Sequence, residues 1–414
     1  MINKNLVLIT RSYPYGYAEP FLENEMPFLS GFFEKIYILP EHREPERIRK
    51  IPSNAILSDC LNTKYNFKFN LFLLYALLRF PLLFLRSIIS SNSRYIMNHL
   101  LYSHRLFYFF LKESHKSLIL KKFIQKLRLD KNTTLYYTYW FHRSALALTI
   151  LKQQSIVKYM VSRVHGVDLY DERWDIGMVP FRGYILDYID ILFPISLSSK
   201  EYLEKKIKAD QVHKLSVSKL GVQVQNSVNL ERPVQFPNFS LISVANLYPL
   251  KRIHEIPEIL NKINEVQIHW YHFGDGPLRE KLMSTTENMK SNIKFFYFGQ
   301  KDNQEIIKFY KENYIDLFIS ISLSEGLPVS IMEAMSFGIP IFAINTGGIP
   351  ELVNQERGII INPDCDYSSM GSRLEKMLIK INDYDRAKIK DFADKNCSDF
   401  INYGSFIEKL QSIQ

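Results

Sequence analysis

Residues 322–351 decide the fold, and they read SLSEGLPVSIMEAMSFGIPIFAINTGGIPE. An apolar run ends at Ser322, a short turn follows, and Pro328 stands where proline favours the beginning of a helix. The residues up to Phe337 continue that helix, and Gly338 is a residue type that ends one. The segment therefore predicts a strand, a turn and a helix whose first backbone N–H groups have no partner within the helix.

The start of that helix is a candidate binding site for a diphosphate. The N–H groups of Leu327 and Val329 would point out of the helix, where the helix dipole favours an anion. Glu325 precedes the helix and Glu333 lies roughly 7–8 Å along it, so the two carboxylates cannot form a close dyad of the glycosidase kind. A carboxylate can accept hydrogen bonds from paired hydroxyls. The layout suits a ligand with a diphosphate between a sugar and a ribose.

Short apolar runs alternate with longer amphipathic runs along the chain, a pattern typical of parallel sheets covered by helices. We expect an α/β protein with two doubly wound, Rossmann-like domains that face a cleft, and ligands beyond the carboxyl ends of the strands. The predicted strands are residues 5–10, 35–39, 135–139, 159–165, 191–196 and 215–220 in the first half, and 240–244, 266–274, 293–299, 316–322, 340–344 and 358–361 in the second.

A chain of 414 residues is longer than a single domain with one hydrophobic core usually is, so we expect two domains. Residues 223–238 contain two prolines and several Asn and Gln without a helical period, so we interpret them as a linker. The prediction is an N-terminal domain of residues 1–225, a C-terminal domain of residues 226–390, and a last helix within residues 391–414, at 392–410, that crosses back to the first domain.

The net charge of +9 is unevenly placed, because residues 60–131 contain 13 Lys and Arg against two acids. The most apolar part of this basic segment, residues 71–89, is interrupted by Arg79, Pro81 and Arg86, so we predict no membrane-spanning helix there. A basic, aromatic-rich helical stretch can lie on an anionic membrane surface, or it can be a solvated face over a core. Both remain open, and the absence of a nucleic-acid-binding motif speaks against a nucleic-acid partner.

The three cysteines are scattered without metal-ligand spacing, which favours a reducing compartment and hence a cytoplasmic protein. An Asp-Cys-Asp string at residues 364–366 follows the last predicted strand, and we interpret it as accidental. The sequence therefore predicts no metal site.

The segment quoted at the outset resembles the retaining glycosyltransferases of family 4, which have the GT-B fold. Its two glutamates have the E-x7-E spacing of that family, and the strings S-x-x-E-G-x-P, E-A-M-x-x-G-x-P and G-G-x-P-E match around them. A bare E-x7-E would fit a solvated glutamate pair equally well, but neighbouring matches argue against that. The resemblance implies that Glu325 contacts the donor sugar and that Glu333 binds the ribose. It also implies that the phosphates are held by the backbone amides of Gly326, Leu327 and Val329.

Residues 243–253 (SVANLYPLKRI) resemble the phosphate-binding turn of the family, which usually holds an Arg and, five residues later, a Lys. Lys251 fits the Lys, whereas Asn246 stands in the place of the Arg. Asn donates a hydrogen bond without a charge, and a lost charge-assisted hydrogen bond costs about 1.5–3 kcal/mol. The neighbouring Arg252 should point elsewhere. Residues 273–278 (FGDGPL) resemble a turn of the family that mainly marks the fold.

In the first half, residues 165–170 (HGVDLY) resemble the H-x-x-D-x-Y segment of the family. The resemblance implies that His165 faces the donor sugar and positions its hydroxyls. Asp168 either shares in that site or caps the next turn.

The first loop, residues 12–25 (SYPYGYAEPFLENE), has Gly16 where the family often has two adjacent glycines near the donor phosphates, a variant that resembles a bacterial surface-polysaccharide subgroup. Glu19 and Glu23 are either acceptor contacts or part of a solvated helix face. Trp140 and His142 either line an acceptor pocket or belong to a core aromatic cluster.

The resemblance implies a metal-independent hexosyltransferase-type enzyme (EC 2.4) without a cofactor, whose catalytic residues are Glu325, His165 and Lys251. Its co-substrate would be a nucleotide-diphosphate sugar of the UDP or GDP type. The expected acceptor is a saccharide, lipid-linked at the inner face of the cell membrane, in capsule, exopolysaccharide or lipopolysaccharide biosynthesis. The alternative is a non-catalytic GT-B subunit that binds the acceptor for another transferase; Asn246 favours it, and the intact Glu325 and Glu333 speak against it.

Overall fold

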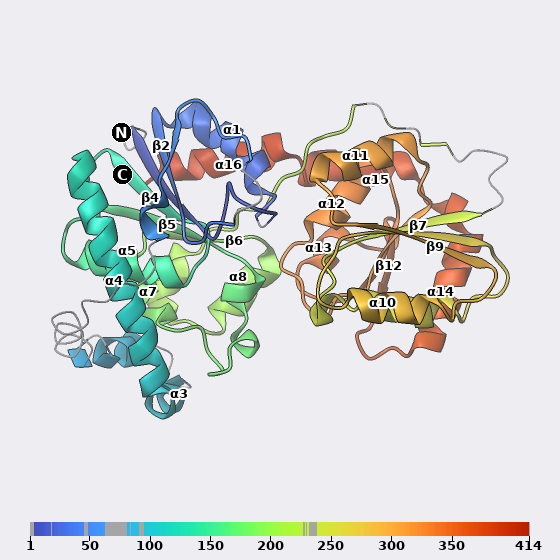
Figure 1. Ribbon diagram of the computed structural model, residues 1–414, viewed down its shortest axis with the longest axis horizontal. Coiled ribbons are helices and arrows are strands. Elements are labelled where there is room, and N and C mark those ends of the chain that lie inside the picture. Colours follow the sequence, from blue (N-terminus) through green and yellow to red (C-terminus); the bar gives the residue numbers. More distant parts are fainter. Residues whose placement is uncertain are drawn as a thin grey trace. The chain divides into compact units, whose positions relative to one another are not determined.

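The computed structural model describes residues 4–17, 19–44, 49–62, 81–82, 84–90, 95–226, 228, 230–231 and 238–413. The chain divides into two compact units (Figure 1). The first unit is Met1–Lys219 with Tyr403–Gln414, and the second unit is Leu220–Asn402. The boundary at Lys219 lies a few residues before the one predicted after residue 225.

The first unit contains a parallel sheet whose described strands have the order β3-β2-β1-β4-β5-β6. The order reverses direction between β1 and β4, so the loops that follow these two strands meet at a topological switch point, where such sheets bind ligands. The strands are β1 (Asn5–Thr10), β2 (Lys35–Pro40), β3 (Ala55–Leu57), β4 (Thr134–Thr138), β5 (Tyr159–Val164) and β6 (Ile191–Pro194).

Helices cover both faces of this sheet (Figure 1). One face carries α1 (Leu22–Phe32) and the end of α16 (Asp399–Gln411), where Met26 and Phe406 share a core. The other face carries α4 (Ser103–Leu127), α5 (Arg143–Gln153) and α7 (Arg182–Tyr188). This unit also contains α3 (Ile96–Leu101), α6 (Gly166–Leu169) and α8 (Leu197–Glu204).

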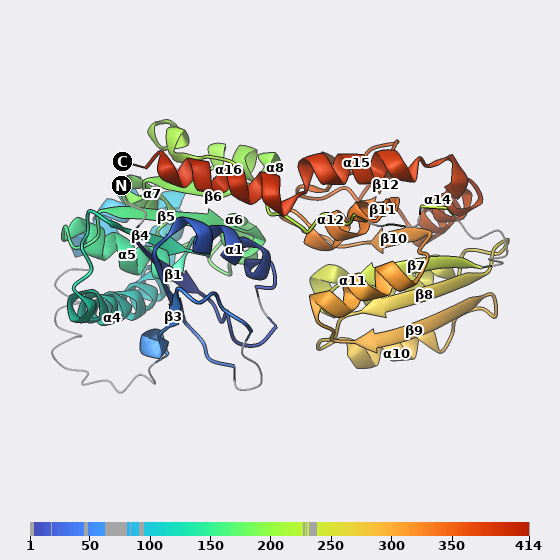
Figure 2. The same cartoon turned by 90° about the horizontal axis from the view of Figure 1, so that it is seen from above.

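The second unit has a parallel sheet of described strands in the order β12-β11-β10-β7-β8-β9. The strands are β7 (Phe239–Val244), β8 (Ile268–Phe273), β9 (Ile293–Gly299), β10 (Leu317–Ser320), β11 (Ile341–Ile344) and β12 (Gly358–Ile361). One face is covered by α9 (Ile256–Leu260), α10 (Arg279–Thr286) and α14 (Tyr367–Ile379), the other by α11 (Asn303–Glu312), α12 (Val329–Ser336) and α15 (Arg386–Asn396) (Figures 1 and 2). The short α13 (Ile349–Leu352) follows β11.

Two predicted elements are wrong. Residues 215–220 form no strand, and the described part of that stretch makes a single bridge, from Leu215 to Leu192. The predicted helix at residues 392–410 is two helices, because α15 ends at Asn396 and α16 begins at Asp399. The Val222 N–H group donates to the Cys397 carbonyl at 2.8 Å, and the Asp399 N–H group donates to the Val222 carbonyl at 2.9 Å. This strand-like pairing uses the backbone at the junction, so one continuous helix cannot form.

Part of the basic segment (residues 60–131) and part of the predicted linker lie outside the described residues. Where the basic segment is described, it exposes several large apolar side chains. They are Leu82, Leu85, Ile89, Met97, Leu100, Leu101 and Tyr108, each more than half exposed. None of the helices in the described part of the chain combines the length and the apolar character that crossing a bilayer requires.

Candidate active site

The start of α12 is the candidate anion site of the second unit. The helix begins at Val329, and Pro328 is its N-cap residue rather than its first helical residue. The Pro328 carbonyl accepts the N–H groups of Ile331 and Met332 at 3.1 and 3.2 Å. Within the described part of the chain, the N–H groups of Gly326, Leu327 and Val329 donate to no protein acceptor. These donors at the positive end of the helix dipole form an arrangement that favours an anion.

Lys251 and Glu325 lie together beside this helix start. Lys251 ends the turn after β7, and Glu325 lies in the turn after β10, the neighbouring strand of the sheet. The Lys251 Nζ atom donates to the Glu325 Oε1 atom at 2.6 Å, and both side chains are less than a third exposed. The Leu323 N–H group donates to the Leu250 carbonyl at 2.9 Å, which joins the two turns. An ammonium group and a carboxylate therefore stand next to the unpaired amides.

Glu333 lies inside α12 and is buried. Its Oε1 atom accepts a hydrogen bond of 2.6 Å from the side-chain amide of Asn303, the first residue of α11. Burial raises the pKa of Glu333 to about 7, against the opposing effect of the Asn303 hydrogen bond. Asn303 was not predicted as a site residue, because its contact with Glu333 joins two helices whose mutual placement no motif encodes.

The turn that contains Asn246 packs closely against the backbone at Gly274. A Cβ atom on Gly274 would lie 2.0 Å from the Ala245 carbonyl oxygen, so only glycine fits there. Asn246 itself is exposed. The guanidinium group of Arg252 binds the Glu255 carboxylate, with its Nε atom 2.6 Å from Oε2, so it does not supply the charge that Asn246 lacks.

In the first unit, Glu19 organises the loop after β1. Its carboxylate accepts the backbone N–H groups of Arg11, Ser12 and Tyr13 at 2.8, 2.9 and 2.8 Å, and the indole N–H of Trp140 at 2.6 Å. Glu19 is 2% exposed, and its backbone adopts the left-handed region with φ of 57°. Four donors occupy the acceptor positions of this carboxylate. Glu19 therefore holds the loop and Trp140 in place, and the expectation of a solvated helix face is wrong for it, whereas an acceptor contact stays a prediction.

His165 follows β5 and is enclosed by aromatic rings. The ring centroids of Phe21, Tyr139 and Trp140 lie 5.5, 4.8 and 4.7 Å from that of the imidazole. Burial, together with the nearby Arg163 charge, lowers the pKa of His165 well below its usual value, so the ring is neutral at pH 7. The Asp168 carboxylate accepts the His165 backbone N–H group at 2.6 Å, so Asp168 caps α6.

The other predicted acceptor-side residues lie at the same end of the first sheet. Trp140 and His142 are half-buried in the segment between β4 and α5. Burial lowers the pKa of His142 to about 4, and its ring packs edge-on against Trp174 with centroids 5.8 Å apart. Gly16 is buried in the first loop with a positive φ of 61°. A glycine is favoured there by backbone conformation.

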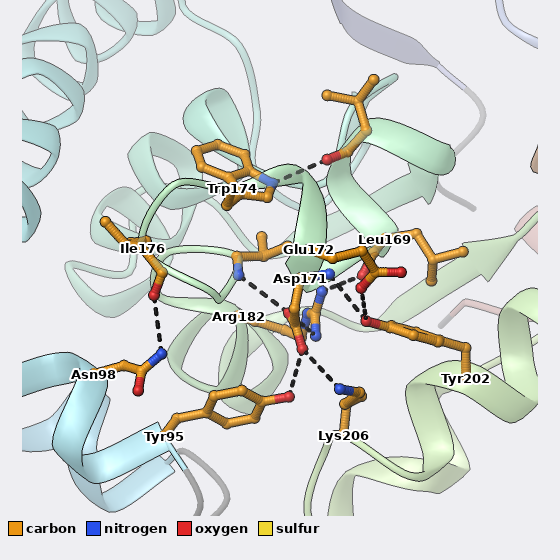
Figure 3. A network of polar contacts seen from close by, with 12 residues as sticks. Tyr95, Asn98, Leu169, Asp171, Glu172, Trp174, Ile176, Arg182, Tyr202 and Lys206 are labelled. Carbon is orange, nitrogen blue, oxygen red and sulfur yellow. Dashed lines mark hydrogen bonds and ion pairs between the residues drawn. The ribbon is translucent and has the colours of Figure 1, made fainter. Parts of the chain in front are cut away.

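A second polar cluster of the first unit surrounds Asp171 (Figure 3). The Asp171 carboxylate binds Arg182 at 2.9 Å and Lys206 at 3.3 Å, and Tyr95 donates to it at 2.5 Å. The cavity beside this cluster has a volume of about 20 Å³, enough for water but not for a sugar. As far as the described residues show, the cluster therefore connects α7 and α8 with the segment before α3 and leaves no room for a sugar.

The Asp-Cys-Asp string has a structural role at its second acid. The Asp366 carboxylate accepts the backbone N–H group of Ser369 at 2.9 Å and caps α14. Among the described residues, no group of three or more His, Cys, Asp and Glu side chains has the arrangement of a metal site.

Comparisons with known proteins place these features in a wider group. Residues 235–394, within the second unit, match the sequence model of a family described as "Glycosyl transferases group 1". The putative colanic acid biosynthesis glycosyltransferase WcaL of Escherichia coli (strain K12) is 26% identical over 233 residues, which cover 54% of this chain and 56% of that protein. The O-antigen biosynthesis glycosyltransferase WbnH of Escherichia coli is 24% identical over 207 residues, 50% of this chain and 56% of that protein. The chain thus spans about half the length of these curated relatives.

Two solved structures resemble the whole chain. The apo form of the lipopolysaccharide outer core galactosyltransferase WaaB has a TM-score of 0.68 at 14% identity, over 99% of this chain and 100% of that one. Anabaena Alr3699/HepE in complex with UDP and glucose has a TM-score of 0.66 at 13% identity, over 98% and 99%. At this identity the likeness shows the fold alone. The GT-B fold predicted from the sequence is confirmed, and so is the resemblance to glycosyltransferases.

Proposed function

We propose that this GT-B chain is a glycosyltransferase that moves a sugar from a nucleotide-diphosphate sugar to a saccharide acceptor. The single observation that carries the proposal is the ion pair of Lys251 and Glu325 beside the unpaired amides at the start of α12. This arrangement offers a cation and backbone donors to a diphosphate, and a carboxylate to sugar hydroxyls. Glu333 accepts the ribose hydroxyls at the other end of the same ligand.

In the proposed reaction, the bond between the anomeric carbon and the diphosphate oxygen breaks, and a bond to the acceptor oxygen forms. Lys251 and the amides of Leu327 and Val329 stabilise the charge that develops on the leaving diphosphate. The acceptor attacks from the side that the diphosphate leaves, so the anomeric configuration is retained. The acceptor proton passes to the departing phosphate oxygen, and neither a metal ion nor a cofactor takes part. His165, as a neutral imidazole, positions the hydroxyls of the donor sugar.

The function is tested by incubating the protein with a panel of UDP- and GDP-sugars and candidate saccharide acceptors. We expect release of the nucleoside diphosphate together with glycosylated acceptor for one donor. Glu325→Gln should lower turnover at least about a hundredfold, on the scale of losing one stabilising contact in a transition state. The matched control is Glu356→Gln, an exposed acid of the same unit, which should keep wild-type turnover.

The alternative is a non-catalytic subunit that presents an acceptor to another transferase. The observation in its favour is Asn246, which leaves the phosphate-binding turn without a second cation because Arg252 is bound by Glu255. Under this alternative, wild type and Glu325→Ala would show equally negligible turnover on every donor and acceptor. The enzyme proposal requires the two proteins to differ.

We infer further that the acceptor is lipid-linked, in bacterial polysaccharide biosynthesis at the inner face of the membrane. The names of the relatives support the pathway class. The basic segment supports the membrane, since it combines cationic side chains with exposed apolar ones. In this inference the protein is cytoplasmic and binds the inner surface of the membrane peripherally.

Flotation with anionic liposomes tests the membrane inference. Charge reversal to Glu at Lys121, Lys122 and Lys126 of α4 should release the protein from the liposomes. Reversal of three exposed lysines of the second unit should not, and Lys281, Lys308 and Lys311 serve as that control. Equal binding of the two triple variants would refute the membrane inference.

A further inference from the structure

The contact between Asn303 and Glu333 joins two helices at the proposed ribose end of the donor site. Glu333 lies in the interior of α12, and Asn303 is the first residue of α11. The Asn303 Nδ2 atom donates to the Glu333 Oε1 atom at 2.6 Å. An amide can donate to a carboxylate but gains nothing from a carboxylic acid OH group in the same place. The contact therefore depends on the charge state of Glu333 and on the position of Asn303.

The position of Asn303 is fixed by the residue before it. Asp302 is the N-cap of α11, and its backbone N–H group donates to the Glu305 carboxylate at 3.1 Å. The Glu305 N–H group in turn donates to the Asp302 carbonyl at 3.0 Å. This capping arrangement holds the first turn of the helix. Asn303 is itself half-buried, so its amide is held in place relative to α12.

Around Glu333, the described residues supply no cation. Tyr310, also on α11, is the titratable neighbour, and burial first and the Glu333 charge second keep the pKa of its hydroxyl well above the usual value. α15 packs against α12 and presents Arg386, but that guanidinium group donates to the carbonyls of Ile315 at 2.8 Å and Phe337 at 3.5 Å. Among the described residues, no Lys or Arg forms an ion pair with Glu333, and the hydrogen bond from the Asn303 amide is what favours its charged form.

We propose that Asn303 is a positioning residue for nucleotide binding: its amide orients the Glu333 carboxylate so that both ribose hydroxyls can donate to it. The inference rests on the proposed function, because it takes the ligand to be a nucleoside diphosphate. Asn303 acts through Glu333 and does not itself contact the ligand.

The sign of the effect follows from the hydrogen bond. Loss of the Asn303 amide removes an interaction that favours the charged form, so the pKa of Glu333 rises above about 7. At neutral pH more of the variant then carries a protonated Glu333, which has lost part of its acceptor capacity for hydroxyls. Raising the pH deprotonates Glu333 again and restores binding. A purely structural defect of α11 would not recover in this way.

The experiment measures the dissociation constants of UDP and GDP by calorimetry from about pH 6 to about pH 9, a range that brackets the Glu333 pKa. Asn303→Leu should weaken the better nucleotide roughly tenfold at neutral pH, and the deficit should shrink as the pH rises. Asn303→Gln keeps an amide donor and should recover part of the loss. Gln304→Leu, an exposed neighbour on the same helix, should behave as wild type.

A ribose-specific arm separates positioning from folding. With the 2′,3′-dideoxy form of the same nucleotide, wild type and Asn303→Leu should bind equally, because no hydroxyl remains for Glu333 to accept. Equal losses at every pH, or equal losses with the normal and dideoxy nucleotides, would overturn the role of Asn303 while leaving the proposed function in place. Absence of UDP and GDP binding by the wild type would overturn both.

Discussion

The Nζ atom of Lys251 lies 2.6 Å from the Oε1 atom of Glu325, although the two residues are 74 positions apart in the chain. The contact follows from sheet topology. Lys251 follows β7 and Glu325 follows β10, and these neighbouring parallel strands end at the same edge. In the protein without ligand, the ion pair satisfies both charges beside the start of α12. A bound diphosphate would take over the ammonium group and leave the carboxylate for sugar hydroxyls.

This division of roles predicts different phenotypes for the two partners. Lys251→Met should weaken nucleoside diphosphate binding roughly tenfold to a hundredfold, because a charge-assisted contact of about 1.5–3 kcal/mol is lost. Glu325→Gln should leave the affinity for the nucleoside diphosphate nearly unchanged. It should abolish the tighter binding of the nucleotide sugar relative to the nucleoside diphosphate. Calorimetric titration with the diphosphate and its nucleotide sugar measures both. Identical losses in the two variants would contradict separate roles.

Glu19 should control the order of the first loop. Glu19→Ala removes the acceptor of three backbone N–H groups and of the Trp140 indole, so the amides of Arg11, Ser12 and Tyr13 should lose protection against hydrogen exchange. Each buried donor left without a partner costs about 1–3 kcal/mol.

Glu23→Ala is the matched control for Glu19. Its carboxylate is partly exposed, binds Arg49 at 3.1 Å and accepts none of the three backbone N–H groups, so its removal should leave the three amides protected. Unchanged exchange in Glu19→Ala, measured by hydrogen–deuterium exchange, would show that the loop is held by other contacts.

Arg163 and Glu25 should contribute to the free energy of unfolding as a coupled pair, so that losing one of them costs most of what losing both would cost. Both side chains are fully buried at a distance of 3.2 Å, and Tyr137 donates to the same carboxylate at 2.9 Å. Arg163→Met should lower the free energy of unfolding of the first unit by about 3–5 kcal/mol, because it leaves a buried carboxylate without a counter-charge. The double variant with Glu25→Gln should lose less than the sum of the single variants in denaturant unfolding. Additive losses would contradict the coupling.

Glu333 should make the second unit less stable as the pH rises. Its folded-state pKa of about 7 lies above the ordinary value of 4.5, so the folded state holds a proton that the unfolded state releases in this interval. The free energy of unfolding should therefore fall between about pH 4.5 and pH 7, by at most about 3 kcal/mol. Thermal unfolding of wild type and Glu333→Gln measures it. The variant should lack this fall, and parallel pH profiles would contradict the assignment.

The strand, turn and helix around Pro328 were predicted from local residue preferences. The contact between Lys251 and Glu325 was not predicted, because it follows from the adjacency of β7 and β10 in the sheet. The burial of Glu19 did not follow, because a positive φ at Glu19 and the indole of Trp140, which follows β4, together turn its carboxylate inward.

Two other features depend on contacts that no local pattern carries. The Asn303 contact requires the relative placement of α11 and α12, which the packing of both on the sheet decides. The break between α15 and α16 is caused by Val222, whose backbone pairs with the backbone at the junction of the two helices. Val222 lies near the start of the second unit, far from that junction in the sequence. A continuous helical period in residues 392–410 gave no sign of that competing partner.

The central claim is that the amides at the start of α12 hold a diphosphate. Titration of isotopically labelled protein with UDP and with GDP, followed by the backbone amide resonances, tests it most directly. We predict that the signals of Gly326, Leu327 and Val329 shift in proportion to occupancy by one of the nucleotides, and that the shifts weaken in Lys251→Met. Saturation by the nucleotide with these three signals unmoved, or no response to either nucleotide, would contradict the account.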